Sequence, residues 1–184
     1  MIERVRGGDT DTYAVLVRRY AADARRAAVV AGVGADAEDI TQAAFVKAYQ
    51  NLTRFRDGAA FRPWLLRIVV NEARNAIRAD RRRRAAAERL AWLGGVPADD
   101  GDPADVAVHD DTRSVLRAAL RELPETQRQV VVCRYILDLD EQESATVLGW
   151  PRGTVKSRLH RALRQLRARL DGEEPAEREA EHGR

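Results

Sequence analysis

Apolar residues recur every three or four positions through most of the chain, and this period predicts helices. Near the C-terminus the apolar positions are Val155, Leu159, Ala162, Leu163, Leu166 and Leu170. Upstream, residues 141–148 form a shorter helical segment that can bury Ala145 and Leu148, and the Gly-Trp-Pro sequence at 149–151 interrupts the pattern. Proline is tolerated in the first turn of a helix, where its missing N–H has no intrahelical partner. A helix, a tight turn and a longer helix are the parts of a helix-turn-helix.

Positive charge is concentrated on the second of these helices. Residues 152–169 contain seven Lys or Arg and no Asp or Glu, although the whole chain has 32 Lys plus Arg against 29 Asp plus Glu. A solvated surface helix would explain a lone run of charge, but solvated faces usually mix signs, because like-charge neighbours destabilise a helix by about 0.2–0.5 kcal/mol per pair. Together with the turn and the preceding helix, the run favours binding to nucleic acid in the major groove.

Two further amphipathic stretches lie in the first half of the chain. Residues 36–52 begin with three acids, which suit the positive end of a helix dipole, and their predicted buried positions are Ile40, Ala43, Ala44, Phe45, Ala48 and Leu52. In residues 65–84 the predicted buried positions are Leu65, Ile68, Val69, Ala73 and Ile77, and four arginines at 81–84 extend a basic surface.

The stretch between them, residues 55–64, combines aromatic and basic side chains with Gly and Pro. Single-stranded nucleic acid is bound by such side chains, because bases stack on aromatic rings and guanidinium groups meet phosphates. Phe61 and Trp64 are better explained as core residues. Phe55 fits either role.

Composition divides the chain into two helical units. Residues 94–111 contain six Asp, two Pro and three Gly but no Lys or Arg, which is typical of a linker. Residues 171–184 are acidic and lack large apolar side chains. The sequence therefore predicts an all-α protein, with a helical domain over 1–93, a flexible acidic linker over 94–111, a helix-turn-helix domain over 112–170 and a disordered tail over 171–184.

Other classes of protein are disfavoured. The single cysteine, Cys133, lies in an apolar run and is predicted to be a core residue, and the three histidines are scattered, so we expect neither a disulfide nor a metal site. We find no signal peptide and no run of 18 apolar residues, which predicts a cytoplasmic chain without membrane insertion. No phosphate-binding glycine loop or nucleophile-base pair occurs, so neither an enzyme nor a cofactor is predicted.

Three stretches together resemble a known family. They are DAEDITQAAFVKAYQNLTRFRDGAAFRPWLLRIVVNEAR, LPETQRQVVVCRY after the acidic stretch, and GWPRGTVKSRLHRALRQLR. In this order and spacing they resemble the extracytoplasmic-function group of bacterial sigma factors, over nearly all of residues 3–170. The resemblance implies a minimal sigma factor, in which region 2 binds polymerase and melts the minus-ten element and region 4 reads the minus-thirty-five element. A free-standing helix-turn-helix regulator is the alternative, but it leaves the first domain unexplained.

The resemblance also implies three sets of site residues. The polymerase-binding residues are Asp36, Asp39, Gln42 and Lys47. The minus-ten residues are Phe55, Arg56, Asn71, Arg74 and Arg78. A flipped base would stack on Phe55, and the amide of Asn71 would read its edge. The minus-thirty-five residues are Arg152, Thr154, Lys156, Ser157, Arg158, His160 and Arg161.

The partners implied by the resemblance are promoter DNA, an anti-sigma factor and the RNA polymerase core, through its beta-prime clamp helices and beta flap. One departure from the family concerns the helix before the turn, where Ser144 stands at a position that is commonly aliphatic.

Overall fold

The computed structural model describes residues 1–94 and 111–170, and these residues form helices and short connections without any strand. The first unit comprises α1 (Ile2–Arg6), α2 (Thr10–Val30), α3 (Ala37–Gln50) and α4 (Phe61–Gly94), with 3-10 turns at Gly34–Asp36 and Leu52–Arg54. The second comprises α5 (Asp111–Glu122), α6 (Glu125–Val131), a π-helical turn at Val132–Ile136, α7 (Glu141–Leu148) and α8 (Arg152–Leu170). The prediction of an all-α fold with a C-terminal helix-turn-helix is confirmed for these residues.

The domain limits stay a prediction. Gly94 ends α4 and Asp111 begins α5, and the rest of the predicted linker, together with the predicted tail, lies outside the described residues.

The core of the first unit lies between α2, α3 and the first half of α4. Small side chains on α2 and α3 are fully covered and allow the helices to approach closely, and these are Ala24, Ala28, Ala44 and Ala48. From α4 the predicted positions Leu65 and Val69 are fully buried, whereas Ala43, predicted to lie in the stripe of α3, is exposed. Ala43 follows Gln42 on the solvent side, and Thr41 is buried instead, with its hydroxyl donating to the carbonyl of Ala37 (2.7 Å).

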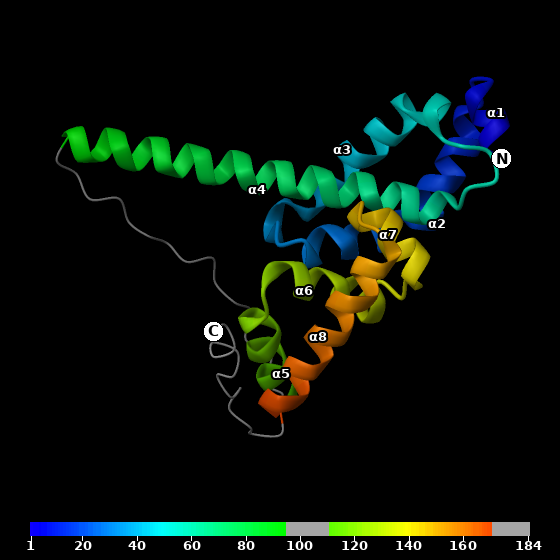
Figure 1. Ribbon diagram of the computed structural model, residues 1–184. Helices are drawn as coiled ribbons and strands as arrows, with labels where there is room; N and C mark the ends of the chain where they lie inside the picture. The colour runs from blue at the N-terminus through cyan, green and yellow to red at the C-terminus, as the bar shows by residue number, and fades with distance from the viewer. Residues whose placement is uncertain (95–110, 171–184) are drawn as a thin grey trace, which may run out of the picture.

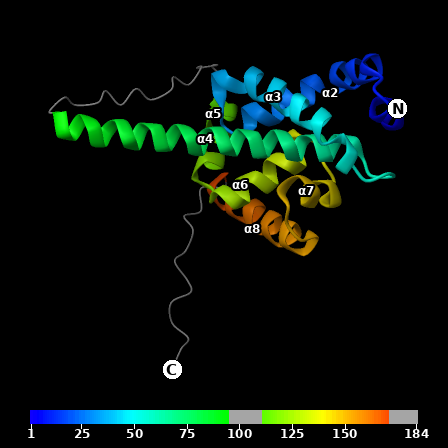
Figure 2. The ribbon, with the colours of Figure 1, turned by 90° about the horizontal axis from the view of Figure 1, so that it is seen from above.

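The long helix α4 has two different halves. In Figure 2 its first half lies between α2 and α3 on one side and α6, α7 and α8 on the other, and in both views its second half extends beyond the two units. Residues 81–89, which include the run of four arginines, are all exposed.

The helix-turn-helix is set by local chemistry at both ends of α7. The carboxylate of Asp140 accepts from the backbone N–H of Glu143 (2.8 Å), and the Glu143 carboxylate accepts from the backbone N–H of Asp140 (2.9 Å). This reciprocal cap fixes the start of the helix. Gly149 ends it in the left-handed region, with φ at 71°, which glycine adopts without the steric cost of a Cβ atom.

The buried stripe of α8 is narrower than the sequence predicted. Val155, Ala162 and Leu166 are buried, but Leu163 is 38% exposed and Leu170 is also exposed. Leu163 follows Ala162 directly, about 100° further round the helix, and therefore lies at the edge of the face that packs on α6 and α7.

The two units pack against each other along one ridge of α4. Residues 62, 66, 70 and 74 follow one another at intervals of four, so their side chains form a row. Leu66 and Val70 in the middle are buried in one cluster with residues of both units, among them Leu137 and Leu148. At the ends of the row, Arg62 Nη2 donates to the Leu137 carbonyl (2.7 Å) and Arg74 Nη2 donates to Gln129 Oε1 (2.8 Å).

Candidate nucleic-acid interface

One face of α8 forms a shallow basic hollow. It has a volume of about 460 Å³ and is lined by Gly153, Lys156, Ser157, His160, Arg161 and Arg164. Four of the predicted minus-thirty-five residues thus lie together, on the side of the helix opposite Val155 and Ala162. Arg164 was not in the predicted set, although it lies seven positions after Ser157, which is about two helical turns. That spacing is the signal by which the sequence could have identified it.

The other predicted minus-thirty-five residues lie beside this hollow. Arg152 Nε contacts Glu141 Oε2 at 2.9 Å, and the Arg158 guanidinium lies over the ring of Trp150, 4.1 Å from its centroid. Thr154 is half-buried, and its carbonyl accepts from the Ser157 hydroxyl (3.1 Å). A stacked guanidinium keeps its outward N–H groups, so Arg158 can still donate to a phosphate from the flank of the helix.

The predicted minus-ten residues of α4 differ in their availability. Asn71 and Arg78 are exposed and lie two turns apart on one face, and Arg56 is exposed on the preceding loop. Arg74 lies between Asn71 and Arg78 in sequence but is half-buried and bonded to Gln129 of the second unit. Its guanidinium is therefore occupied by the contact between the units.

Phe55 lies in an aromatic cluster. The residue is 5% exposed, and its ring packs edge-on against Trp64 and Phe61, with centroids 5.1 and 5.9 Å away. Phe61 is also buried, as predicted, and Trp64 packs against the same core. Stacking a base on Phe55 therefore requires the ring to leave this cluster.

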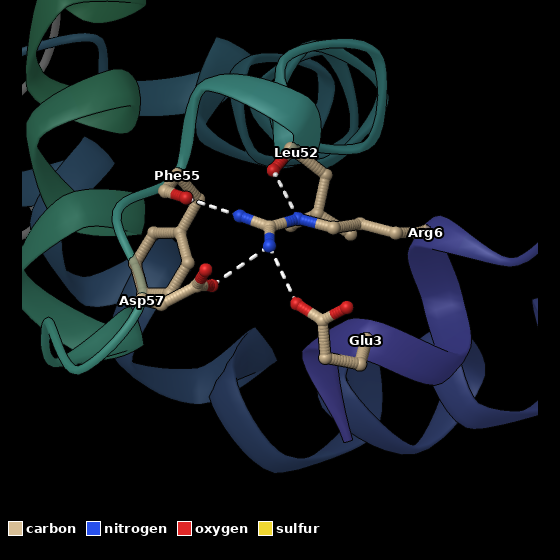
Figure 3. A network of polar contacts seen from close by, with 5 residues as sticks. All are labelled: Glu3, Arg6, Leu52, Phe55 and Asp57. Carbon is tan, nitrogen blue, oxygen red and sulfur yellow. Dashed lines mark hydrogen bonds and ion pairs between the residues drawn. The ribbon is translucent and has the colours of Figure 1, made fainter.

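The loop that carries Phe55 is bonded to α1 through Arg6 (Figure 3). Arg6 Nε donates to the Leu52 carbonyl (3.2 Å), and Nη2 donates to the Phe55 carbonyl. Nη1 contacts Glu3 Oε1 at 2.6 Å and Asp57 Oδ1 at 2.7 Å. Burial opposes the charge of Arg6, but the hydrogen bonds to Asp57 and Glu3 outweigh it and raise the pKa of Arg6 above its usual value.

The predicted polymerase-binding residues lie on the outer side of α3. Asp36, Asp39 and Gln42 are exposed, whereas Lys47 is held against α4 by Glu72, with Nζ and Oε1 2.5 Å apart. Val46, which is 57% exposed, follows Gln42 by one turn on the same face. Val46 was in neither the predicted buried stripe nor the predicted polymerase-binding set, although its spacing of four from Gln42 is a signal that could have identified it.

The remaining predictions concern chemistry away from these surfaces. Cys133 is buried, as predicted, and burial raises its pKa to about 12, so the thiol stays protonated at neutral pH. Within residues 1–94 and 111–170, no group of His, Cys, Asp and Glu is placed to hold a metal ion. Among the helices of these two ranges, none combines the length and the apolar character needed to cross a membrane.

Both units match models of known families. Residues 12–83 match sigma-70 region 2, and residues 113–166 match sigma-70 region 4.

Relatives match over most of the chain. The ECF RNA polymerase sigma-E factor of Escherichia coli K12 is 33% identical over 170 residues, which cover 88% of each chain. The ECF RNA polymerase sigma factor SigW of Bacillus subtilis is 32% identical over 176 residues, or 92% of this chain and 94% of the relative.

Solved structures are similar as well. CnrH in complex with the cytosolic domain of CnrY is 28% identical, with a TM-score of 0.66 over 94% of this chain and 96% of that one. The sigma factor RpoE of Bartonella quintana, solved with the anti-sigma factor NepR, has the same fold at 23% identity, with a TM-score of 0.62 over 87% of this chain and 97% of that one.

Proposed function

The chain belongs to the extracytoplasmic-function sigma factors of the sigma-70 family, and we propose how its two units divide the recognition of a promoter. As a sigma factor, the protein acts in transcription initiation with RNA polymerase. A free-standing helix-turn-helix regulator is not favoured, because the first unit also matches a sigma region. We propose that the chain works in the cytoplasm, where it directs the polymerase by binding rather than by catalysis.

The second unit would read the minus-thirty-five element in duplex DNA. The single observation that carries this assignment is the basic hollow on α8, which faces outward from a capped helix-turn-helix. Lys156, Ser157, His160 and Arg161 lie early in the helix and would meet base edges in the major groove. Arg152, Thr154 and Arg158 flank them and would contact phosphates, which position the helix without reading sequence.

The first unit would bind the minus-ten element as a single strand. Asn71, Arg78 and Arg56 are exposed and available for this purpose. Arg74 and Phe55 would join them only after Arg74 leaves Gln129 and the ring of Phe55 leaves its cluster. The binding energy of the strand would have to offset these lost contacts.

The outer face of α3 would dock on the beta-prime clamp helices of the polymerase, through Asp36, Asp39, Gln42 and Lys47. Val46 extends that face with an apolar contact of the kind found in the centres of interfaces. The second unit would bind the beta flap. We also propose an anti-sigma factor as a partner, since the similar sigma factor of Bartonella quintana was solved with one.

In-vitro transcription with polymerase core and fragmented genomic DNA tests this proposal. We expect defined start sites that need the chain and share minus-ten and minus-thirty-five elements. Substitution of Gln42 by Arg should reduce binding to core, whereas substitution of the exposed Gln142 on α7 should not. Specific binding of the free chain to duplex DNA, without transcription from any start site, would support the regulator instead.

A further inference from the structure

We infer that Arg6 is a positioning residue for minus-ten recognition, because it fixes the backbone of the loop that presents Phe55 and Arg56. The inference rests on the proposed function of that loop. Arg6 is one of the residues that the sequence analysis did not single out, and its contacts with the loop join positions that are 46 to 51 residues apart in the chain.

The contacts of Arg6 surround the short turn at Leu52–Arg54. The two carbonyls that it binds belong to Leu52, where the turn begins, and Phe55, which follows its end (Figure 3). A guanidinium is planar, and its N–H groups point in fixed directions. Binding both carbonyls with one guanidinium therefore fixes their separation and orientation, which a flexible ammonium group could not do.

The hydrogen bonds of Arg6 lie partly inside the protein and partly at its surface. Arg6 is 19% exposed, whereas the side chain of Asp57 is 78% exposed. Asp57 and Glu3 balance the charge of Arg6 at the surface, while the carbonyl contacts are part-buried. The geometry of the loop therefore depends mainly on the carbonyl contacts, and the carboxylates orient the guanidinium from outside.

The backbone and the ring of Phe55 are held by different contacts. The carbonyl of Phe55 accepts a hydrogen bond from Arg6, whereas the ring packs against Trp64 and Phe61 within the core cluster. The ring can leave the aromatic cluster by rotation about its side-chain bonds while the loop keeps its course. A strand would then meet a loop already in place, and less ordering entropy would oppose binding.

The test compares Arg6→Ala with Arg4→Ala in the full chain assembled with polymerase core. Arg4 lies on the same helix but pairs with Asp9 (2.7 Å) instead of the loop. Three affinities are measured: for core, for a duplex with the minus-thirty-five element, and for a single-stranded oligonucleotide with the non-template minus-ten sequence. Both DNAs come from a promoter found by start-site sequencing.

We expect Arg6→Ala to weaken binding of the single-stranded oligonucleotide by about tenfold, which is the size of the effect of one lost hydrogen bond to a charged group. Binding of core and of the minus-thirty-five duplex should stay unchanged, and Arg4→Ala should match the wild type throughout. Arg6→Lys should behave like Arg6→Ala, since it keeps the charge but loses the planar geometry. Asp57→Asn, whose side chain is 78% exposed, removes one carboxylate contact of Arg6 and keeps both carbonyl contacts, so it should cause a smaller loss on the oligonucleotide alone.

Two results would overturn the inference while leaving the proposed function intact. One is normal binding of the oligonucleotide by Arg6→Ala, and the other is an equal loss of all three affinities, which would show that Arg6 only stabilises the fold. If the wild-type chain itself bound neither core nor the oligonucleotide, the proposed function would be wrong, and the inference would fall with it.

Discussion

The two candidate DNA surfaces of this chain differ in how far they are already formed. On α8, Lys156, His160 and Arg161 face solvent around a hollow. In the first unit, Phe55 is buried, and Arg74 is bonded to Gln129. If both bind DNA as proposed, the surface on α8 would bind without rearrangement, and the surface of the first unit would have to exchange internal contacts for contacts with DNA.

The difference follows from the form of DNA that each surface would bind. The groove edges of a duplex are accessible from outside, so a rigid exposed helix is sufficient to read them. A flipped base needs an aromatic surface, and aromatic rings that are permanently exposed favour association with other proteins. On the proposed function, burial of the Phe55 ring against Trp64 and Phe61 would avoid that exposure until a base takes their place.

The largest effect is expected for Phe55→Ala. Because the ring is buried, its removal should lower the free energy of unfolding by about 3–5 kcal/mol. If the ring also stacks on a base, promoter opening should lose a further contribution of about 1–3 kcal/mol. Urea unfolding measures the first effect, and permanganate reactivity of the minus-ten element in the holoenzyme complex measures the second.

Asn71→Ala is the matched control for Phe55→Ala. Asn71 is exposed, so its loss should change the unfolding free energy by less than about 0.5 kcal/mol and still reduce permanganate reactivity. Normal melting with both variants would show that neither residue holds the flipped base.

The second prediction divides the positive charges of α8. Lys156→Ala and Arg161→Ala should each cost about 1–3 kcal/mol of discrimination between the cognate and a scrambled minus-thirty-five element. Because Arg164 lines the same hollow, Arg164→Ala should resemble them. Arg167→Ala should weaken binding to all sequences alike and reduce the salt slope by about one unit. Holoenzyme binding to both elements across a salt series measures these effects.

Equal losses on cognate and scrambled DNA for every variant would contradict this division. The basic face of α8 would then be only an electrostatic surface, and the first-unit surface would carry the sequence specificity.

The helix-turn-helix of α7 and α8 could be predicted from the sequence better than the loop that carries Phe55. The bounds of α7 and the buried positions Val155 and Ala162 follow from a local period and from the turn at Gly149. The contacts of Arg6 could not be predicted, because its partners include backbone carbonyls of residues 52 and 55, which carry no signal in the residue type.

The contact between the two units could not be predicted from local sequence patterns either. Leu65 and Val69 already accounted for the core face of α4, and the apolar character of Leu66 and Val70 did not identify what covers them. On their ridge of α4 they lie between Arg62 and Arg74, and they are buried in one cluster that includes residues of the second unit. Because the partner of this ridge could not be predicted, Arg74 was predicted to bind DNA, and its hydrogen bond to Gln129 was not foreseen.

A third prediction tests whether the contact with Gln129 limits the minus-ten surface. Gln129→Ala should free Arg74 and strengthen binding of a single-stranded minus-ten oligonucleotide by the free chain about fivefold, which corresponds to about 1 kcal/mol for one hydrogen bond. Fluorescence anisotropy measures the affinity. Gln142→Ala, an exposed change on α7, should have no effect. Unchanged affinity with Gln129→Ala would mean that Arg74 is not held back by the second unit.

The smallest effect is expected for a substitution of Ser144 on α7, the helix that packs against α8. This side chain is completely buried on α7, and its hydroxyl has no hydrogen-bond partner. A buried hydroxyl without a partner carries an uncompensated desolvation cost, so Ser144→Ala should raise the free energy of unfolding by about 0.5–1 kcal/mol. Urea unfolding measures this change.

Because the hollow on α8 is already formed, the affinity of the holoenzyme for the minus-thirty-five duplex should stay the same with Ser144→Ala. A more stable variant with altered affinity would show that the surface of α8 depends on the packing around Ser144, and that the second unit has to rearrange when it binds, as proposed for the first.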